Sequence, residues 1–199
     1  MKTWVITGGA GSGKSSLVRS LRALLPSAGV FSADLAVSEA LGCKEVIEKL
    51  LTCFGPAVEV APGVVNRPWL RDFVLGDPVR RKKLEAILHP PVLEALEAGR
   101  ECAHRSGTNL FLAEVPLHYE IGSTVSADLV IVVASSRSVQ VRRMMETRGL
   151  DEQTVHKFLD AQWPIEAKVE RADAVIWNDG SPASLEAQVL TLASPLLLA

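Results

Sequence analysis

The sequence lacks any apolar run near the roughly 20 residues that a membrane-spanning helix needs. Its start, MKTWVITGG, has only a short apolar stretch before two glycines, and the terminal SPLLLA is shorter than any span. A secretory signal peptide requires a longer apolar core than this. We therefore expect a cytoplasmic protein that has no secretory leader and no membrane anchor.

Cysteine is also scarce. Cys43, Cys53 and Cys102 form no C-x-x-C pair, and an odd number leaves at least one thiol unpaired. Together with the four histidines they do not give the spacing of a metal site. We expect three reduced cysteines that behave as small apolar residues buried in the protein.

A strong charge of either sign is absent as well. The formal net charge is −2, which argues against a nucleic-acid-binding protein that depends on a basic surface but still allows a local basic cleft for a phosphorylated small molecule. With 199 residues, 48% hydrophobic and 22% charged, the composition is that of a globular protein. The length suits one core, or one core with an inserted subdomain.

Alternation of strand and helix signals organises the chain. Residues 3–7 are a short β-rich run, residues 14–25 have apolar side chains at helical spacing, and residues 30–32 are a second short strand. Residues 36–105 change to helical patterns that we expect to break at Gly55-Pro56, Pro62-Gly63, Asp77-Pro78 and Pro90-Pro91.

The second half returns to strands. Residues 109–115 and 127–135 are continuous apolar runs, which is typical of strands buried on both faces of a parallel sheet. A basic helical segment follows, then a strand at 174–178 and a helix at 183–193. The pattern predicts an α/β fold with a doubly wound parallel sheet of about five strands.

A phosphate-binding motif opens the chain. Residues 8–15, GGAGSGKS, match G-x-x-x-x-G-K-S/T between a predicted strand and a predicted helix, which is the context that this motif requires. Backbone N–H groups of such a loop surround phosphate oxygens, and the helix N-terminus adds positive potential. Lys14 would reach the β- and γ-phosphates, and the Ser15 hydroxyl would bind Mg²⁺. An incidental glycine-rich turn is the alternative interpretation.

Other motifs narrow the class of P-loop protein. The N-K-x-D motif of GTPases and the LSGGQ signature of ABC proteins are absent. Residues 137–148 are rich in arginine and suit a kinase lid, which brings cations over the transferred phosphoryl group. A solvated basic helix face would have the same composition.

Several further blocks resemble the dephospho-CoA kinase family, nearly from end to end. ITGGAGSGKS is similar to that family's opening, SAD at 32–34 to its D-A-D, and EVPLHYE at 114–120 to its d-V-P-L-L-F-E. Residues 63–90 resemble the block that ends in H-P, and Gln140 with Arg143 and Arg148 resembles Q-x-x-R…R. Ala161-Gln162 matches an A-x-Q position, and Ala172-Asp173 with Asn178 and Gly180 matches A-D…N-x-G.

The resemblance implies a P-loop kinase core at residues 1–35, 106–136 and 172–199, a helical CoA-binding insertion at 36–105 and a lid at 137–171. It implies transfer of the γ-phosphoryl group of ATP to the ribose 3′-hydroxyl of dephospho-CoA, giving coenzyme A and ADP. The expected partners are ATP with Mg²⁺ and dephospho-CoA, with no nucleic acid and no membrane; the oligomeric state stays open.

The site residues follow from the same matches. Catalysis is expected from Asp34, Lys14 and Arg143, with Asp34 as the base or orienting group for the acceptor hydroxyl. Nucleotide binding is expected from Gly9, Ala10, Gly11, Ser12, Gly13, Lys14, Ser15, Ser16, Arg148, Asn178 and Gly180. Acceptor binding is expected from Asp34, Arg67, His89, Pro116, Leu117 and Glu120. Ser15 would bind Mg²⁺ directly, and Glu114 is a candidate for holding it through a water.

Two points stay open at this stage. Asp34 stands at a strand–helix junction, where a carboxylate also serves as an ordinary helix N-cap. Ser32 and Ser38 replace the first acid of D-A-D and a following arginine, so the acceptor could be another nucleoside-type molecule. A degenerate member that binds ATP or CoA without turnover is a further alternative, and a P-loop NTPase switch is the weakest.

Overall fold

The computed structural model describes residues 1–123 and 125–197. These residues form two compact units: residues 1–31 together with 99–199, and residues 32–98. The chain passes between them at the end of one strand and within one long helix. Each unit is described by itself.

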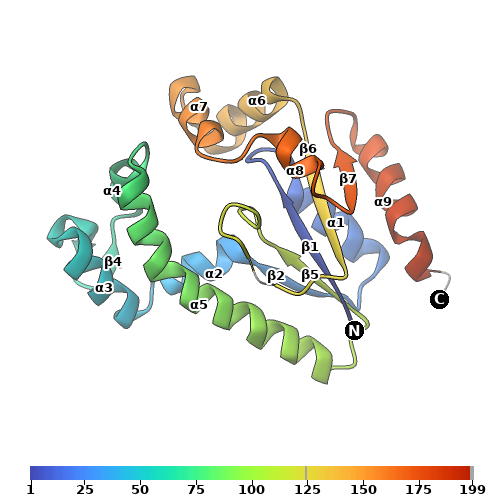
Figure 1. The fold of residues 1–199 in the computed structure, drawn as a ribbon, viewed down its shortest axis with the longest axis horizontal. Helices are drawn as coiled ribbons and strands as arrows, with labels where there is room; N and C mark the ends of the chain where they lie inside the picture. The colour runs from blue at the N-terminus through green and yellow to red at the C-terminus, as the bar shows by residue number, and fades with distance from the viewer. Residues whose placement is uncertain (124, 198–199) are drawn as a thin grey trace. The chain divides into compact units, whose positions relative to one another are not determined.

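The larger unit is built on a five-stranded sheet (Figure 1). Its strands are β1 (Lys2–Gly8), β2 (Gly29–Ser32), β5 (Leu110–Glu114), β6 (Leu129–Ala134) and β7 (Ala174–Trp177), in the order β2-β5-β1-β6-β7. β1 pairs in parallel with β5 and β6, and β6 with β7. The predicted doubly wound α/β fold is confirmed.

The strand order makes the end of β1 the natural ligand position. β5 and β6 lie on opposite sides of β1, and in such sheets ligands bind where the order reverses, at the carboxyl ends of the strands. The P-loop follows β1 directly.

Helices cover both faces of this sheet. α1 (Lys14–Leu24) and α9 (Pro182–Leu197) pack on one face, where Leu17, Leu21 and Val189 join the main core of the sheet. α8 (Ile165–Val169) packs against β6, and the end of α5 (Pro78–Arg105) covers Phe111 through Gly99 and Ala103. Burial on both faces explains why the strands are continuous apolar runs.

α6 (Arg137–Arg148) and α7 (Glu152–Asp160) form a helix pair with its own small core. Met144, Val155 and Leu159 are buried in it, and the side chain that completes the cluster is Ala10 of the P-loop. The region predicted to be a lid therefore begins with two helices that hold the phosphate loop.

The smaller unit contains α2 (Ala33–Ala40), α3 (Lys44–Phe54), the 3₁₀ turn η1 (Pro56–Val58), the hairpin of β3 (Glu59–Ala61) and β4 (Val64–Val65), α4 (Arg67–Val74) and the first part of α5. Its core gathers residues from all these helices around Ile47, Leu50 and Leu70. The hairpin was not predicted: Pro62-Gly63, expected to break a helical pattern, is its turn, and Gly63 has a φ of 78°.

Two expectations were wrong. No break occurs at Pro90-Pro91, because both prolines lie inside α5, which runs unbroken from Pro78 to Arg105. Each proline removes one N–H donor from the helix, but the fixed φ of proline is close to the helical value. The helical segments on either side of Pro90-Pro91 therefore continue through the pair. The three cysteines are free, as expected, but exposed and not buried. Cys53 and Cys102 lie at exposed positions of α3 and α5, and Cys43 is the N-cap that precedes α3.

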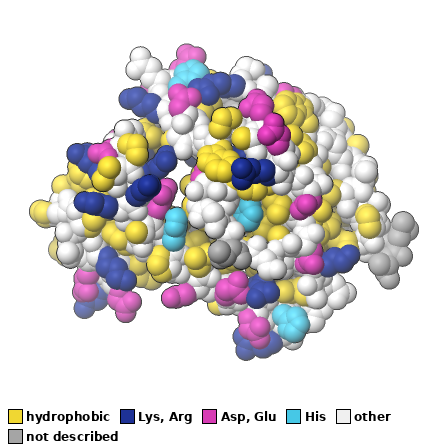
Figure 2. All heavy atoms as spheres, viewed as in Figure 1, with side chains coloured by type: hydrophobic (Ala, Val, Ile, Leu, Met, Phe, Trp, Pro, Cys, Tyr) yellow, Lys and Arg dark blue, Asp and Glu magenta, His cyan; other side chains and the backbone are white. Residues whose placement is uncertain are grey.

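No helix in the described part of the chain is long and apolar enough to cross a membrane. Lys and Arg side chains alternate with Asp and Glu over the face drawn in Figure 2, with no large area of one sign. The described surface of this face therefore has the mixed charge that the near-neutral composition suggested.

The face that α1 and α9 cover should carry much of the stability. Leu21 is fully buried there, whereas Leu190 on α9 is 50% exposed. Leu21→Ala should lower the free energy of unfolding by about 2–5 kcal/mol through lost burial and a residual cavity. Leu190→Ala should change it by less than about 0.5 kcal/mol. Urea unfolding followed by circular dichroism measures both, and equal losses would contradict the assignment of this core.

Candidate functional site

The P-loop has a backbone that only glycine allows at its key positions. Gly8 has a φ of 141°, and a Cβ there would lie 2.1 Å from the carbonyl oxygen of Val133 on the next strand. Gly13 is left-handed, with a φ of 95°, and precedes α1. Within the described residues no side chain caps the start of α1, and an uncapped helix N-terminus favours the binding of an anion.

Lys14 and Ser15 begin α1, and each side chain makes hydrogen bonds to another part of the site. The Lys14 ammonium donates to the carbonyl oxygens of Gly9 at 2.9 Å and Gly8 at 3.4 Å, which keeps it folded over the loop. The Ser15 hydroxyl donates to Oε1 of Glu114 at 3.0 Å. Glu114 is the last residue of β5, and parallel strands end at one edge of the sheet, so this pairing follows from the topology.

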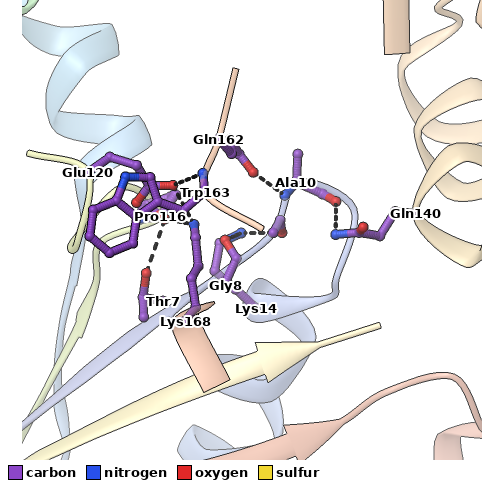
Figure 3. Close-up of polar contacts among 11 residues, drawn as sticks. Thr7, Gly8, Ala10, Lys14, Pro116, Glu120, Gln140, Gln162, Trp163 and Lys168 are labelled. Atoms are coloured by element: carbon purple, nitrogen blue, oxygen red, sulfur yellow. Dashed lines mark hydrogen bonds and ion pairs between the residues drawn. The ribbon is translucent and has the colours of Figure 1, made fainter. Parts of the chain in front are cut away.

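Five side chains from the second half of the chain hold the loop from behind. Gln162 accepts from the Ala10 N–H at 2.9 Å, and Gln140 donates to the Ala10 carbonyl at 3.0 Å (Figure 3). The Ser12 carbonyl accepts from Asn178 at 2.8 Å, Ser135 at 3.3 Å and Arg143 at 3.4 Å. The carbonyls of Ala10 and Ser12 thus accept hydrogen bonds from side chains outside the loop.

Two of the other predicted site residues, Arg143 and Asn178, contact this loop. Arg143 is half-buried and donates to Ser12 and to the Ser135 hydroxyl, whereas Arg148 is exposed at the last residue of α6. Asn178 is only 7% exposed, and its side-chain amide is used to donate to the Ser12 carbonyl. Gly180 is exposed in the turn before α9.

The turn after β5 contains the three predicted acceptor residues Pro116, Leu117 and Glu120, all half-buried. Glu120 makes a 2.6 Å ion pair with Lys168, whose side chain is completely buried. Glu120 also accepts from the backbone N–H of Trp163 at 3.1 Å. In the described structure, therefore, this carboxylate is engaged by protein groups. Lys168, a fully buried cation, was missed because its surroundings are set by distant segments.

The smaller unit contains Asp34, Arg67 and His89. Asp34 is exposed in the first turn of α2, and the helix N-cap is Ser32, whose hydroxyl accepts from the Leu35 N–H at 3.4 Å. The N-cap alternative for Asp34 was therefore wrong: the cap is the serine that replaces the first acid of D-A-D, and Asp34 stays available for other contacts.

Arg67 contacts the second departure from the family pattern. Its guanidinium donates to the Ser38 hydroxyl and to the Ser38 carbonyl, both at 2.8 Å. Ser38 thus orients this arginine through a fork of two hydrogen bonds, where another arginine would repel it. His89 is half-buried in the middle of α5.

A cavity of about 580 Å³ adjoins the start of the P-loop. It is bordered by the ends of β6 and β7, the start of α6 and the segment after α7. Its lining residues include Gly9, Gln140, Gln162, Trp163 and Trp177. Gln140 and Gln162, the two glutamines that hold Ala10, therefore line this space together with Gly9 of the loop.

Beside the cavity, Asp179 ties the turn after β7 to the start of α6. It accepts from the Ser136 N–H at 2.8 Å and from the Trp177 indole at 3.1 Å. Its partial burial alone would raise the pKa of this carboxyl, but the hydrogen bonds from Ser136 and Trp177 outweigh that effect and lower it. Asp179 therefore stays ionised and keeps the turn in place.

No group of three or more His, Cys, Asp or Glu side chains that could hold a metal ion occurs among residues 1–123 and 125–197. A magnesium ion that is bound mainly through nucleotide phosphates needs only one or two protein oxygens. The Ser15 and Glu114 pair is such a set.

His118 is a buried group within the turn after β5. It is 8% exposed, its Nδ1 has no hydrogen-bond partner in the described structure, and its ring packs edge-on against Tyr119. Burial lowers the pKa of His118 below the ordinary 6.5, and the nearby Glu120 opposes this less strongly. The folded protein therefore holds this imidazole neutral.

A consequence is a pH-dependent loss of stability. The unfolded chain takes up a proton as the pH falls through about 6.5, and folded His118 does so only at lower pH, so protonation favours unfolding. His118→Leu should reduce the fall in unfolding free energy between about pH 7.5 and about pH 5.5, and His104→Leu, at an exposed position, should not. Urea unfolding at both pH values measures this; an unchanged fall in His118→Leu would contradict it.

The chain was compared with known proteins. The family model for dephospho-CoA kinase matches residues 3–184. A dephospho-CoA kinase of Geobacillus kaustophilus is 36% identical over 189 residues, which cover 94% of this chain and 92% of that protein. One from Syntrophotalea carbinolica is 35% identical over 193 residues, 96% of this chain and 90% of the relative.

Solved structures agree in fold. TT1252 from Thermus thermophilus has a TM-score of 0.80 at 32% identity and covers 98% of this chain and 97% of its own. Dephospho-CoA kinase from Campylobacter jejuni has a TM-score of 0.61 at 22% identity, with the same coverage, and so shows the fold alone. With a P-loop closed by Lys14 and Ser15, and with the family match spanning nearly all of its length, this chain belongs to the dephospho-CoA kinase family.

Proposed function

We propose that this protein transfers the γ-phosphoryl group of ATP to the ribose 3′-hydroxyl of dephospho-CoA, giving coenzyme A and ADP. The observation that carries the proposal is the complete P-loop, with Lys14 folded over it and Ser15 paired with Glu114, in a chain that matches the family over residues 3–184. The cytoplasm, where thiols stay reduced, suits its three free cysteines.

The nucleotide would bind through the loop backbone. N–H groups of the P-loop and of the start of α1 would surround the β-phosphate. The Lys14 ammonium would reach toward the γ-phosphate. Arg143 already lies against the loop through Ser12 and Ser135, so a small movement of its guanidinium would place positive charge near the transferred group. Arg148, exposed at the end of the same helix, would act as a second cation.

Magnesium fits the residues present. The Ser15 hydroxyl and the Glu114 carboxylate offer oxygen donors of the kind that this ion prefers, and their 3.0 Å contact brings them to one place. We propose that Ser15 holds the ion directly and Glu114 through water. When bound, the ion would neutralise phosphate charge.

The unit of residues 32–98 contains the carboxylate that we expect to act on the acceptor hydroxyl. Asp34 is exposed and is not used as a cap, so its carboxylate is available to accept the proton of the 3′-hydroxyl. As that oxygen bonds to the γ-phosphorus, the bond from the phosphorus to the ADP oxygen breaks. Arg67, oriented by Ser38, would contact the acceptor's phosphates, and His89, Pro116 and Leu117 would line its path.

A coupled assay of ADP formation tests the proposal. With Mg-ATP, dephospho-CoA should give acceptor-dependent ADP and a product that carries a new 3′-phosphate, while adenosine and nucleoside monophosphates should not. Turnover with a nucleoside acceptor alone would make the protein a kinase of the same fold with another substrate. ATP binding without acceptor-dependent ADP would identify a member that binds without turnover.

Asp34 can be tested separately. Asp34→Asn keeps the shape but removes the proton acceptor, so kcat should fall by about a hundredfold or more while the Kd for ATP changes little. Glu39→Gln, on the exposed side of the same helix, is the matched control and should leave both constants unchanged. Steady-state kinetics and calorimetric ATP binding measure the two constants. Wild-type kcat in Asp34→Asn would remove this carboxylate from the mechanism.

A further inference from the structure

Ala10 in the P-loop has both polar groups of its backbone held by side chains. Its N–H donates to Oε1 of Gln162 at 2.9 Å, and its carbonyl accepts from Nε2 of Gln140 at 3.0 Å (Figure 3). Because a backbone N–H only donates and a carbonyl only accepts, these contacts fix which end of each amide faces the loop. Gln162 must accept and Gln140 must donate.

The neighbouring glycines make room for this arrangement. A Cβ on Gly9 would lie 2.0 Å from Nε2 of Gln140, and one on Gly11 would lie 2.9 Å from the Gln140 carbonyl. Both positions therefore need glycine to admit Gln140, apart from any need to admit phosphate. The methyl group of Ala10 is buried with Met144 and Leu159 in the core of α6 and α7, so apolar packing holds the same residue.

A chain of polar contacts supports Gln162 from the other side. Thr7 at the end of β1 donates to the Pro116 carbonyl at 3.0 Å, and buried Lys168 donates to that carbonyl at 3.4 Å. Lys168 pairs with Glu120, which accepts from the Trp163 N–H next to Gln162. Figure 3 shows these residues in one continuous series. The series starts at Thr7, three residues before Ala10. It ends at Gln162, which is next to Trp163 and accepts from the Ala10 N–H.

We propose that Gln140 and Gln162 are positioning residues for nucleotide binding, and that the Lys168–Glu120 pair fixes the backbone from which Gln162 reaches the loop. By holding the Ala10 peptide, they set the curvature of the loop and so the direction in which the N–H groups of Gly11 and Gly13 face the phosphates. This inference rests on the proposed function only in taking the nucleotide as ligand. A loop shaped in advance binds without the entropy cost of ordering.

The opposite roles of the two amides allow one substitution to test both. Gln162→Glu keeps an acceptor for the Ala10 N–H, whereas Gln140→Glu loses the donor and sets a carboxylate against the Ala10 carbonyl. Each variant adds one negative charge beside the same residue, so their difference reports the hydrogen bonds. Gln153→Glu, exposed on α7, adds the same charge away from the loop and is the control.

The probe is ADP, measured by isothermal titration calorimetry with the full chain. The Kd of Gln140→Glu should exceed that of Gln162→Glu by about tenfold or more, because one variant leaves a buried carbonyl unpaired and the other leaves no group unpaired. Gln162→Ala, which removes the acceptor, should bind ADP about tenfold more weakly than Gln162→Glu. Gln153→Glu should match the wild type.

Kinetics separate positioning from general damage. In Gln140→Glu and Gln162→Ala the KM for ATP should rise while the KM for dephospho-CoA stays near the wild-type value. Equal ADP affinities for Gln140→Glu and Gln162→Glu, or no rescue by Gln162→Glu relative to Gln162→Ala, would overturn the proposal.

The same measurements keep this proposal distinct from the proposed function. A wild-type chain that binds ADP but does not phosphorylate dephospho-CoA would refute the function, and the affinity ratios would still decide the role of the glutamines. An active wild type with equal affinities in the two glutamate variants would refute the positioning role alone. A wild type without ADP affinity would refute both.

Discussion

A loop that binds phosphate through its own N–H groups cannot also use them to build its shape, and the rest of this structure depends on that constraint. Within the described loop the Ser12 N–H donates to the Gly9 carbonyl at 3.2 Å, and the rest of the loop's shape depends on contacts from outside the loop. Side chains from α6, from the segment after α7 and from the ends of β6 and β7 make these contacts. They bind the N–H and the carbonyl of Ala10 and the carbonyl of Ser12. The shape of the loop is therefore held largely by side chains that lie outside it.

The burial of Lys168 follows from the same requirement. Moving an ammonium group fully out of water is costly unless it is paired and hydrogen-bonded. Glu120 and the Pro116 carbonyl supply those partners, and the pair joins the turn after β5 to α8. An apolar pair of similar volume could fill the space, but it could not orient the Trp163 N–H, and with it Gln162. Directional contacts are what this place in the fold needs.

Much of the fold could be predicted because its signals are local. The strands at residues 2–8, 110–114 and 129–134 were visible as apolar runs, and the P-loop as a motif between a strand and a helix. The predictions that failed rested on local residue preferences that the folded structure does not follow. Pro90-Pro91 favours a break, yet α5 continues. Cysteine is typical of buried positions, yet all three cysteines are exposed.

The sequence by itself determined the phosphate loop, its lysine and serine, the order of strands and helices along the chain, and the family to which the chain belongs. Each of these is a contiguous pattern, or a set of patterns in a fixed order. Only the tertiary structure decided that Ser38 orients Arg67, and that two glutamines hold the two polar groups of the Ala10 backbone, one as acceptor and one as donor. Those roles depend on which donor meets which acceptor, and the pairs that hold the loop join residues up to 166 positions apart. No periodicity along the chain specifies such a meeting.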